Sequence, residues 1–359
     1  AVDRLGSKGY SARAMRSIVL GSVTALLFTA CSSSTPPPQN DVAPTAVMTT
    51  TAAADATQTM PAPKARTPDP KTAMVRVLAV SDFHGWLLPL EPKNYSRYFG
   101  GIANMGGMFR HKELATDADT LILDNGDMWT GPMESTLLRG ASVIASYTSP
   151  CFDAANSATQ LFDFGVYVLR ARSAEAKFPF LGANVFKAGT DTHPDYLKPY
   201  AMFDRDGVKV AVVGLSFIGT PQTTLAKHVA GLEFRDYAPT LKQMVPAVRK
   251  AGAEVVVVLL HDTVDAARRV AAETKDLNIA GFVAGQNHRK ERFEVDGTPV
   301  INPGPFGRSY VRFDISVDRA SRKMLKVEHE IVDVVGEVSA PAFPPEPQLH
   351  RYKLILPLL

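Results

Sequence analysis

Residues 74–85 read MVRVLAVSDFHG, an aliphatic run that ends in an Asp-x-His triplet. The first seven residues have the β-branched, almost unbroken apolar composition of a strand that is covered on both faces. Asp82 and His84 follow this run directly. Because sites in open α/β sheets form beyond the carboxyl ends of the strands, this stretch predicts a buried strand with a polar site at its end.

The same pattern of an apolar run followed by polar residues recurs along the chain. Further strands are predicted at residues 120–123, 178–184, 209–215, 254–260, 279–284, 299–302 and 309–317. Apolar residues at three- and four-residue spacing predict helices at 165–175, 237–251 and 263–274. Strands that alternate with helices indicate an α/β layered domain, and no repeat of fixed period is present.

Five polar residues that could bind a metal ion stand directly after predicted strands: Asp82, His84, Asp127, His261 and His288. Each one alone is weak evidence, since a histidine or a Gly-Asp pair after a strand often has a purely structural role. Five in succession, all at strand ends, favour one shared site. Imidazoles and carboxylates together suit Mn, Fe, Zn or similar divalent ions.

The order of these motifs resembles the signature of the calcineurin-like metallophosphoesterases, which is Asp-x-His, Gly-Asp, Asn-His-Glu, His and Gly-His-x-His. The segments VLAVSDFHG, LILDNGDMWTGPMES, FDFGVYVLRAR, AKFPFLGANVF and DGVKVAVVGL look like the N-terminal domain of the bacterial 5′-nucleotidases. The resemblance extends from residue 74 to about residue 335. It implies a four-layer αββα sandwich that hydrolyses phosphoesters with two divalent ions.

The resemblance also assigns metal ligands. The first ion would be held by the complete set of Asp82, His84, Asp127 and His288. The second ion would share Asp127 as a bridging and catalytic carboxylate, and it would use His261. Its remaining ligands would come from positions 159 and 286, which the family fills with Asn and His.

The chain departs from the family at those two positions and at two others. Residues 158–165 read ATQLFDFG where the family has Ala/Gly-Asn-His-Glu-Phe-Asp-Phe-Gly, so Thr159 replaces the Asn ligand and Gln160 the catalytic His. Leu161 replaces the Glu, and Gln286 replaces the first histidine of the last motif. Thr159 and Gln286 offer only neutral oxygens, which are weak ligands. Gln160 cannot act as a general acid, a role worth about 10²–10⁴-fold in rate.

Residues 15–31, MRSIVLGSVTALLFTAC, have the layout of a secretory signal, and residues 1–14 before them show no pattern. The apolar run is shorter than the ~20 residues of a membrane span. Cys31 resembles the acylated cysteine of a bacterial lipoprotein, with a plain signal peptide as the alternative. The Pro-, Thr- and Ala-rich residues 32–73 are expected to form a disordered tether.

Residues 74–335 are the expected phosphoesterase domain, and residues 336–359 are expected to form a Pro-rich tail in place of the C-terminal domain of the 5′-nucleotidases. The formal net charge is only +3 and no long basic run is present, which argues against a nucleic-acid polymer as partner. Two cysteines, Cys31 and Cys151, cannot form a disulfide framework. A monomer, attached to the bacterial envelope only by a lipid at Cys31, is expected.

Three functions stay open. The first is a metal-dependent hydrolase of nucleotides or other small phosphomonoesters, impaired by the replacements at positions 159, 160 and 286. The second is a pseudoenzyme of the same fold that binds one metal ion or a phosphate ligand. The third is an envelope protein without a metal ion. Trp86, Asn184 and Arg308 are weaker candidates for residues that approach a substrate.

Overall fold

The structure is a computed structural model that describes residues 69–90, 99–109, 119–148 and 152–336. The chain divides into two units, residues 1–59 and 60–359, and every described residue belongs to the second. Several predictions concern residues that the structure does not describe: those for Cys31, the signal segment, most of the tether, Cys151 and residues 337–359. The proposed domain boundaries therefore stay predictions.

Two six-stranded sheets form the centre of the described unit. The first has the order β14 (Met324–Asp333), β13 (Ser309–Asp318), β1 (Thr72–Val80), β2 (Thr120–Asp124), β3 (Ala154–Asn156) and β4 (Phe180–Leu181). Its strands β1 to β4 are parallel, whereas β13 is antiparallel to both β1 and β14.

The second sheet has the order β11 (Lys290–Val295), β12 (Thr298–Pro303), β10 (Gly281–Val283), β9 (Val255–Leu260), β7 (Val208–Leu215) and β6 (Tyr200–Arg205). Its four inner strands are parallel, and the two edge strands β11 and β6 are antiparallel to their neighbours. A small third sheet pairs β5 (Val185–Lys187) with β8 (Leu232–Phe234).

The alternation of side chains along each inner strand explains why the sheets stack. In β9, Val255, Val257 and Leu259 enter the core between the two sheets, while Val256, Val258 and Leu260 enter a separate core under the helices. A strand that is buried on both faces reads as a continuous apolar run, as residues 254–260 do. Strand β1 divides its side chains between two cores in the same way.

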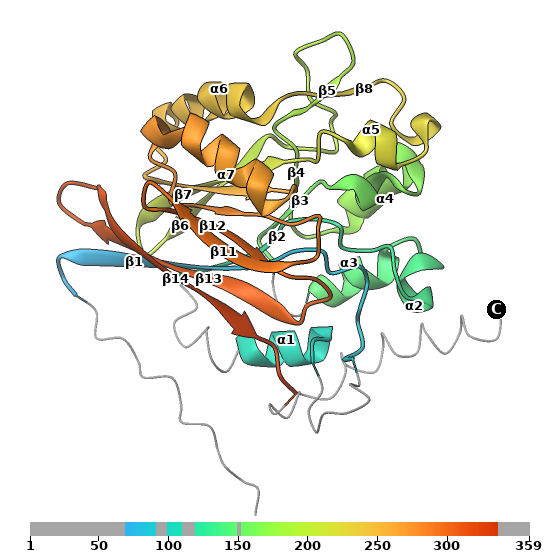
Figure 1. The fold of residues 1–359 in the computed structure, drawn as a ribbon, viewed down its shortest axis with the longest axis horizontal. Helices are drawn as coiled ribbons and strands as arrows, with labels where there is room; N and C mark the ends of the chain where they lie inside the picture. Colours follow the sequence, from blue (N-terminus) through green and yellow to red (C-terminus); the bar gives the residue numbers. More distant parts are fainter. Residues whose placement is uncertain (1–68, 91–98, 110–118, 149–151, 337–359) are drawn as a thin grey trace, which may run out of the picture. The chain divides into compact units, whose positions relative to one another are not determined.

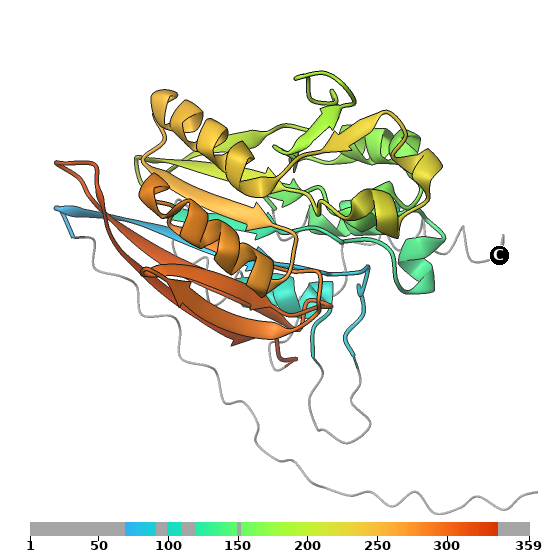
Figure 2. The ribbon, with the colours of Figure 1, turned by 45° about the horizontal axis from the view of Figure 1, so that its top comes forward.

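Helices cover both outer faces. Helices α6 (Tyr237–Lys250) and α7 (Val264–Glu273) pack on the second sheet, and α1 (Ile102–Met108), α3 (Ala141–Tyr147) and α4 (Gly165–Glu175) pack on the first (Figure 1). The turned view in Figure 2 shows the two sheets between these helices. The four-layer αββα sandwich predicted from the sequence is therefore confirmed.

The remaining elements are short: α2 (Met133–Thr136), α5 (Thr220–Thr223) and the 3-10 turns η3 (Thr159–Phe162), η4 (Ala226–His228) and η5 (Lys275–Leu277). The prediction of one strand over residues 178–184 was wrong in length, because only Phe180–Leu181 pair as β4. The chain turns at Gly182, where a Cβ atom would lie 2.7 Å from Ser157 Oγ. Among the described residues, no helix is long and apolar enough to cross a membrane.

Candidate metal centre

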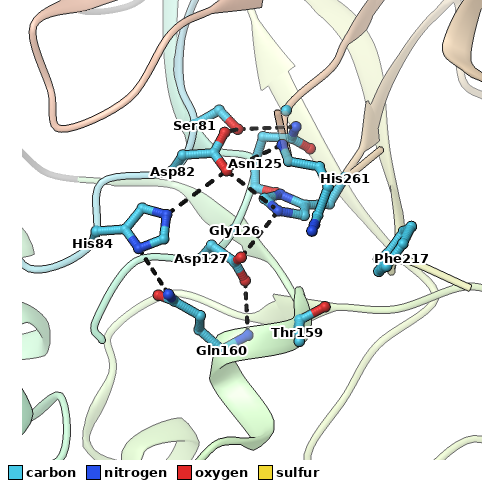
Figure 3. Close-up of polar contacts among 12 residues, drawn as sticks. Ser81, Asp82, His84, Asn125, Gly126, Asp127, Thr159, Gln160, Phe217 and His261 are labelled. Carbon is cyan, nitrogen blue, oxygen red and sulfur yellow. Dashed lines mark hydrogen bonds and ion pairs between the residues drawn. The ribbon is translucent and has the colours of Figure 1, made fainter. Parts of the chain in front are cut away.

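The polar residues of the site come from the carboxyl ends of strands in both sheets. Asp82 and His84 follow β1, Asp127 follows β2, and Gln160 lies in η3 after β3. His261 follows β9, and Gln286 and His288 follow β10. Because these strands are parallel within each sheet and the sheets are stacked, the loops after them converge. Figure 3 shows the side chains of Asp82, Asp127 and His261 pointing toward one another.

Asp82 lies at the centre of the predicted ligands. Its Oδ1 atom is 3.9 Å from His84 Nε2, 3.5 Å from His261 Nε2 and 3.6 Å from His288 Nε2. Asp127 Oδ2 is 3.3 Å from His261 Nε2. The structure thus brings together all five residues that the sequence analysis singled out as strong ligands.

These five residues form two groups that could each hold a metal ion, with ligand atoms within 4.8 Å of one another. One group is Asp82, His84 and His288, and the other is Asp82, Asp127 and His261. The carboxylate common to both groups is therefore Asp82, whereas the family resemblance assigns the bridging role to Asp127. That bridging role stays a prediction.

Two features of the described residues fit a divalent cation at this point. The first is that His261 Nε2 is buried between two carboxylates and has no hydrogen-bond partner among the described residues. The second is backbone strain, because Asp82, His84, Asp127, Gln286 and His288 all have φ between +51° and +67°. Left-handed conformations of residues other than glycine cluster at functional sites.

The electrostatics of the two groups differ. Burial lowers the pKa of His84, although Asp127 and Asp82 act in the opposite direction, and a neutral imidazole is the form that binds metals. Burial also acts to lower the pKa of His261, but the charges of Asp127 and Asp82 outweigh it and raise the pKa to about 10. The negative charge of these two carboxylates is what a bound cation would neutralise.

The replaced positions 159, 160 and 286 have different environments. Gln160 Nε2 lies 2.7 Å from His84 Nδ1, and the backbone N–H of Gln160 donates to Asp127 Oδ1 at 2.8 Å. Thr159 Oγ1 is paired with Thr220 Oγ1 at 3.0 Å. The backbone N–H of Gln286 donates to Asp82 Oδ1, and its Oε1 is buried without a partner among the described residues.

An aromatic residue that the sequence analysis missed also belongs to the site. The ring centroid of Phe306 is 5.7 Å from that of His84, 5.5 Å from that of His288 and 5.2 Å from that of Trp86, so Trp86 does lie beside the site. The Arg308 guanidinium lies 5.1 Å from the same ring. The signal that could have found Phe306 is its Gly-Pro-Phe-Gly loop directly after the predicted strand 299–302.

Asn184, in contrast, has a structural role. It is fully buried, its amide donates to the carbonyls of Ser216 and Arg235, and its Oδ1 accepts from the backbone N–H of Ser216. A side chain whose donors and acceptor are all used by the backbone has no group left for a phosphate.

Comparisons with known proteins agree with this geometry. No protein-family model matches the chain. Protein UshA of Yersinia enterocolitica is 28% identical over 253 residues, which are 64% of this chain and 44% of that protein. The 5′-nucleotidase of Vibrio cholerae is 28% identical over 185 residues, which are 50% of this chain and 32% of that protein.

Two solved structures share the fold. The 5′-nucleotidase precursor of Thermus thermophilus matches with a TM-score of 0.70 and 19% identity, covering 80% of this chain and 60% of that one. The calcineurin-like phosphoesterase YfkN of Bacillus subtilis matches with a TM-score of 0.66 and 19% identity, covering 79% of this chain and 98% of that one.

This chain is a homologue of the 5′-nucleotidases with the calcineurin-like phosphoesterase fold. It spans less than half the length of the two curated relatives. The similarity to the 5′-nucleotidases stated from the sequence is thereby confirmed, and so is the fold.

A further buried carboxylate, Asp124, lies at the end of β2 near this centre. Its Oδ2 accepts from Tyr147 Oη and its Oδ1 from the backbone N–H of Gly126, both at 2.6 Å. Burial raises the pKa of Asp124 to about 7, because these two hydrogen bonds only partly offset the loss of water around the charge. The folded protein therefore holds a proton on Asp124 at pH values where the unfolded chain has lost it.

This pKa predicts a pH-dependent stability that Asp124→Asn should remove. Since the folded state binds the extra proton, the free energy of unfolding should fall as pH rises from about 4 to about 7, by up to about 4 kcal/mol. Urea unfolding of the metal-free protein across this range measures it. The control is Asp276→Asn, in an exposed turn, which should keep the slope of the parent. Equal slopes for Asp124→Asn and the parent would contradict the assignment.

Proposed function

We propose that this protein is a metal-dependent phosphoester hydrolase that acts on nucleotides or other small phosphomonoesters in the bacterial cell envelope. The observation that carries the proposal is the cluster of Asp82 with three imidazoles at the carboxyl ends of parallel strands. The names of its curated relatives support nucleotides as the substrate class. The secretory pattern that ends at Cys31 supports a location in the cell envelope and attachment by a lipid anchor.

The residues of the site have separate roles in this proposal. Asp82, His84 and His288 would hold one cation together with Asp127, and Asp127 and His261 would hold a weaker second one together with neutral oxygens. Mn, Zn or Fe in such a site would act as a Lewis acid on a phosphoryl oxygen and would make water a stronger nucleophile at neutral pH. His288 is exposed, so a substrate in solvent can reach this edge of the site.

The amide of Gln160 imposes a limit on the substrate. It can donate a hydrogen bond but cannot give up a proton at neutral pH, so the leaving oxygen has no acid at this position. Esters whose leaving groups are stable as anions, such as aryl phosphates, should therefore be hydrolysed faster than alkyl phosphates. This preference would be weaker in a relative with histidine at the position.

Hydrolysis of para-nitrophenyl phosphate by the purified protein with added Mn²⁺ tests the proposed function. Asp127→Asn is the matched inactive variant, since it removes one negative charge from the site while the side chain keeps its size. We expect turnover by the parent and a loss to the background rate in the variant. Equal rates in the two proteins would contradict the proposal.

One observation favours a second candidate, a pseudoenzyme that binds a metal ion or phosphate without turnover. Thr159 and Gln160 are both held by hydrogen bonds inside the protein, to Thr220 and to His84, rather than left open toward a substrate. Metal analysis combined with calorimetric titration of inorganic phosphate separates the two. Phosphate binding that depends on the metal, without hydrolysis of any aryl phosphate, would support the pseudoenzyme.

A further inference from the structure

Strand β3 ends in an asparagine that breaks the apolar pattern of its neighbours. Ala154 packs in the core between the two sheets, and Ala155 packs in the core under the helices of the first sheet. Because side chains alternate along a strand, Asn156 points back between the sheets, where it is fully buried. An amide in such an apolar layer is costly unless its polar atoms have hydrogen-bond partners.

The amide of Asn156 connects the two sheets at their carboxyl ends. Its Nδ2 donates to the carbonyl oxygen of Leu215, the last residue of β7, at 2.9 Å and to that of Leu259 in β9 at 3.2 Å. It also lies 3.3 Å from Asn125 Oδ1, in the loop after β2. Backbone carbonyls can only accept, so the NH₂ end of the amide is the end that faces them. One side chain of the first sheet thus binds two strands of the second.

Strand β7 leaves room for this amide. A Cβ atom on Gly214 would lie 2.6 Å from Asn156 Oδ1 and 2.5 Å from Leu181 Cβ. A glycine inside a strand often marks a place where another group approaches the backbone closely. The Asn156 side chain therefore reaches the second sheet because β7 has no side chain opposite it.

Two of the groups that Asn156 contacts also hold His261. The backbone N–H of His261 donates to the Leu215 carbonyl at 3.0 Å, and this is the oxygen that accepts from Asn156. The ring Nδ1 of His261 lies 2.8 Å from the backbone oxygen of Asn125, whose side chain contacts Asn156. Both the backbone and the ring of His261 therefore depend on groups that Asn156 touches.

The position of His261 depends on how the two sheets meet. His261 follows β9 of the second sheet, whereas Asp82 and Asp127 follow strands of the first. Its Nε2 lies 3.3 Å from Asp127 Oδ2 and 3.5 Å from Asp82 Oδ1. A binding site works only when its groups are held within about 0.5 Å of the required geometry, so these distances need a fixed connection between the sheets.

We infer that Asn156 is a positioning residue that ties the two sheets together behind the metal centre and holds His261 at the spacing that a metal ion requires. The inference rests on the proposed metal-dependent function and adds a residue that contacts no metal ion itself. Residues that orient a metal ligand in this way affect metal affinity by about 10–100-fold.

The next residue along the chain provides a matched control. Ser157 is also fully buried, and its hydroxyl lies 2.8 Å from that of Ser216, which follows β7. In the described part of the chain its hydrogen-bond partners are Ser216 and Leu181, and neither of them holds His261. Ser157→Ala therefore removes a polar contact between the same two sheets without touching the groups around His261.

Titration with Co²⁺, followed by its visible absorption, tests the inference. Asn156→Ala should bind Co²⁺ about 10-fold more weakly than the parent, with a changed absorption spectrum, because His261 is no longer held in place. Ser157→Ala should keep the affinity and the spectrum of the parent. Asn156→Val, which suits a strand and also lacks the amide, gives the same test if the alanine variant does not fold. Unchanged Co²⁺ affinity on loss of the amide would overturn the inference.

A double-mutant cycle separates the positioning of His261 from a general loosening of the fold. In His261→Ala the group of Asp82, His84 and His288 is still present to bind Co²⁺. If Asn156 acts through His261, adding Asn156→Ala to this background should change the affinity by less than about 2-fold. A further loss of about 10-fold in that background would contradict the positioning role.

The outcome for the proposed function is separate from these results. Weaker Co²⁺ binding by Asn156→Ala, with no hydrolysis of para-nitrophenyl phosphate by any of the proteins, would support the positioning role and contradict the hydrolase. Hydrolysis by the parent, together with equal Co²⁺ affinities of the parent and Asn156→Ala, would do the reverse.

Discussion

Asp82→Asn should reduce the affinity of this protein for divalent metals by about three orders of magnitude. Asp82 Oδ1 is the single oxygen that faces His84, His261 and His288, at 3.5–3.9 Å from each Nε2. A unit charge at about 4 Å from another, at an effective dielectric constant of about 20, contributes about 4 kcal/mol, which corresponds to roughly 10³ in affinity. Hydrolysis should fall with the metal content.

Elemental analysis and Zn²⁺ titration of the purified variant measure this effect. The control is Asp153→Asn, which removes a partly buried carboxylate that precedes β3 and binds Arg205, at the end of the sheet opposite the site. That variant should lose some stability and keep the metal affinity of the parent. Undiminished metal binding by Asp82→Asn would show that the ion is held elsewhere.

Restoring the three replaced residues together, as Thr159→Asn, Gln160→His and Gln286→His, should raise the turnover number on aryl phosphates by about 10²–10⁴-fold. Gln160→His supplies a group that can give a proton to the leaving oxygen, and the other two changes supply stronger ligands for a second ion. Asp127 and His261 are already 3.3 Å apart and buried, so the second position needs only its missing partners.

Steady-state kinetics and metal analysis of the triple variant measure this effect. We expect the metal content to rise toward two ions per chain. Gln160→Met serves as the comparison, since it removes the amide that contacts His84 without adding an acid. If the triple variant turned over no faster than the parent, the impairment would not lie in Thr159, Gln160 and Gln286, and both the hydrolase and the pseudoenzyme accounts of these residues would fail.

Much of the fold could be predicted because its inner strands are buried on both faces. The run Glu254 to Leu260 is apolar at every position after the first, and the structure gives β9 as Val255–Leu260. The edge strands β14 and β11 were missed for the opposite reason. Every residue of β14 and of β11 is exposed or half-buried, so neither strand has a run of buried apolar residues that the sequence could reveal. Their places depend on pairing with β13 and β12.

By itself, the sequence determined the inner strands, the amphipathic helices and the polar residues that follow those strands. It could do so because the pattern of apolar and polar residues within one segment reflects which of its side chains are buried. It also showed that positions 159, 160 and 286 lack their usual side chains. Only the tertiary structure decided which atoms meet. Gln160 and His84 are 76 residues apart, and their hydrogen bond depends on the loops after β1 and β3 reaching the same point.

The tertiary structure likewise placed Asp82 between three imidazoles and paired Thr159 with Thr220. The physical reason is that a hydrogen bond or a ligand group depends on angles and distances of a few ångströms between separate segments. Those distances follow from the stacking of two sheets and from left-handed backbone turns at Asp82, His84 and Asp127, and neither is written in the order of residues within any one segment.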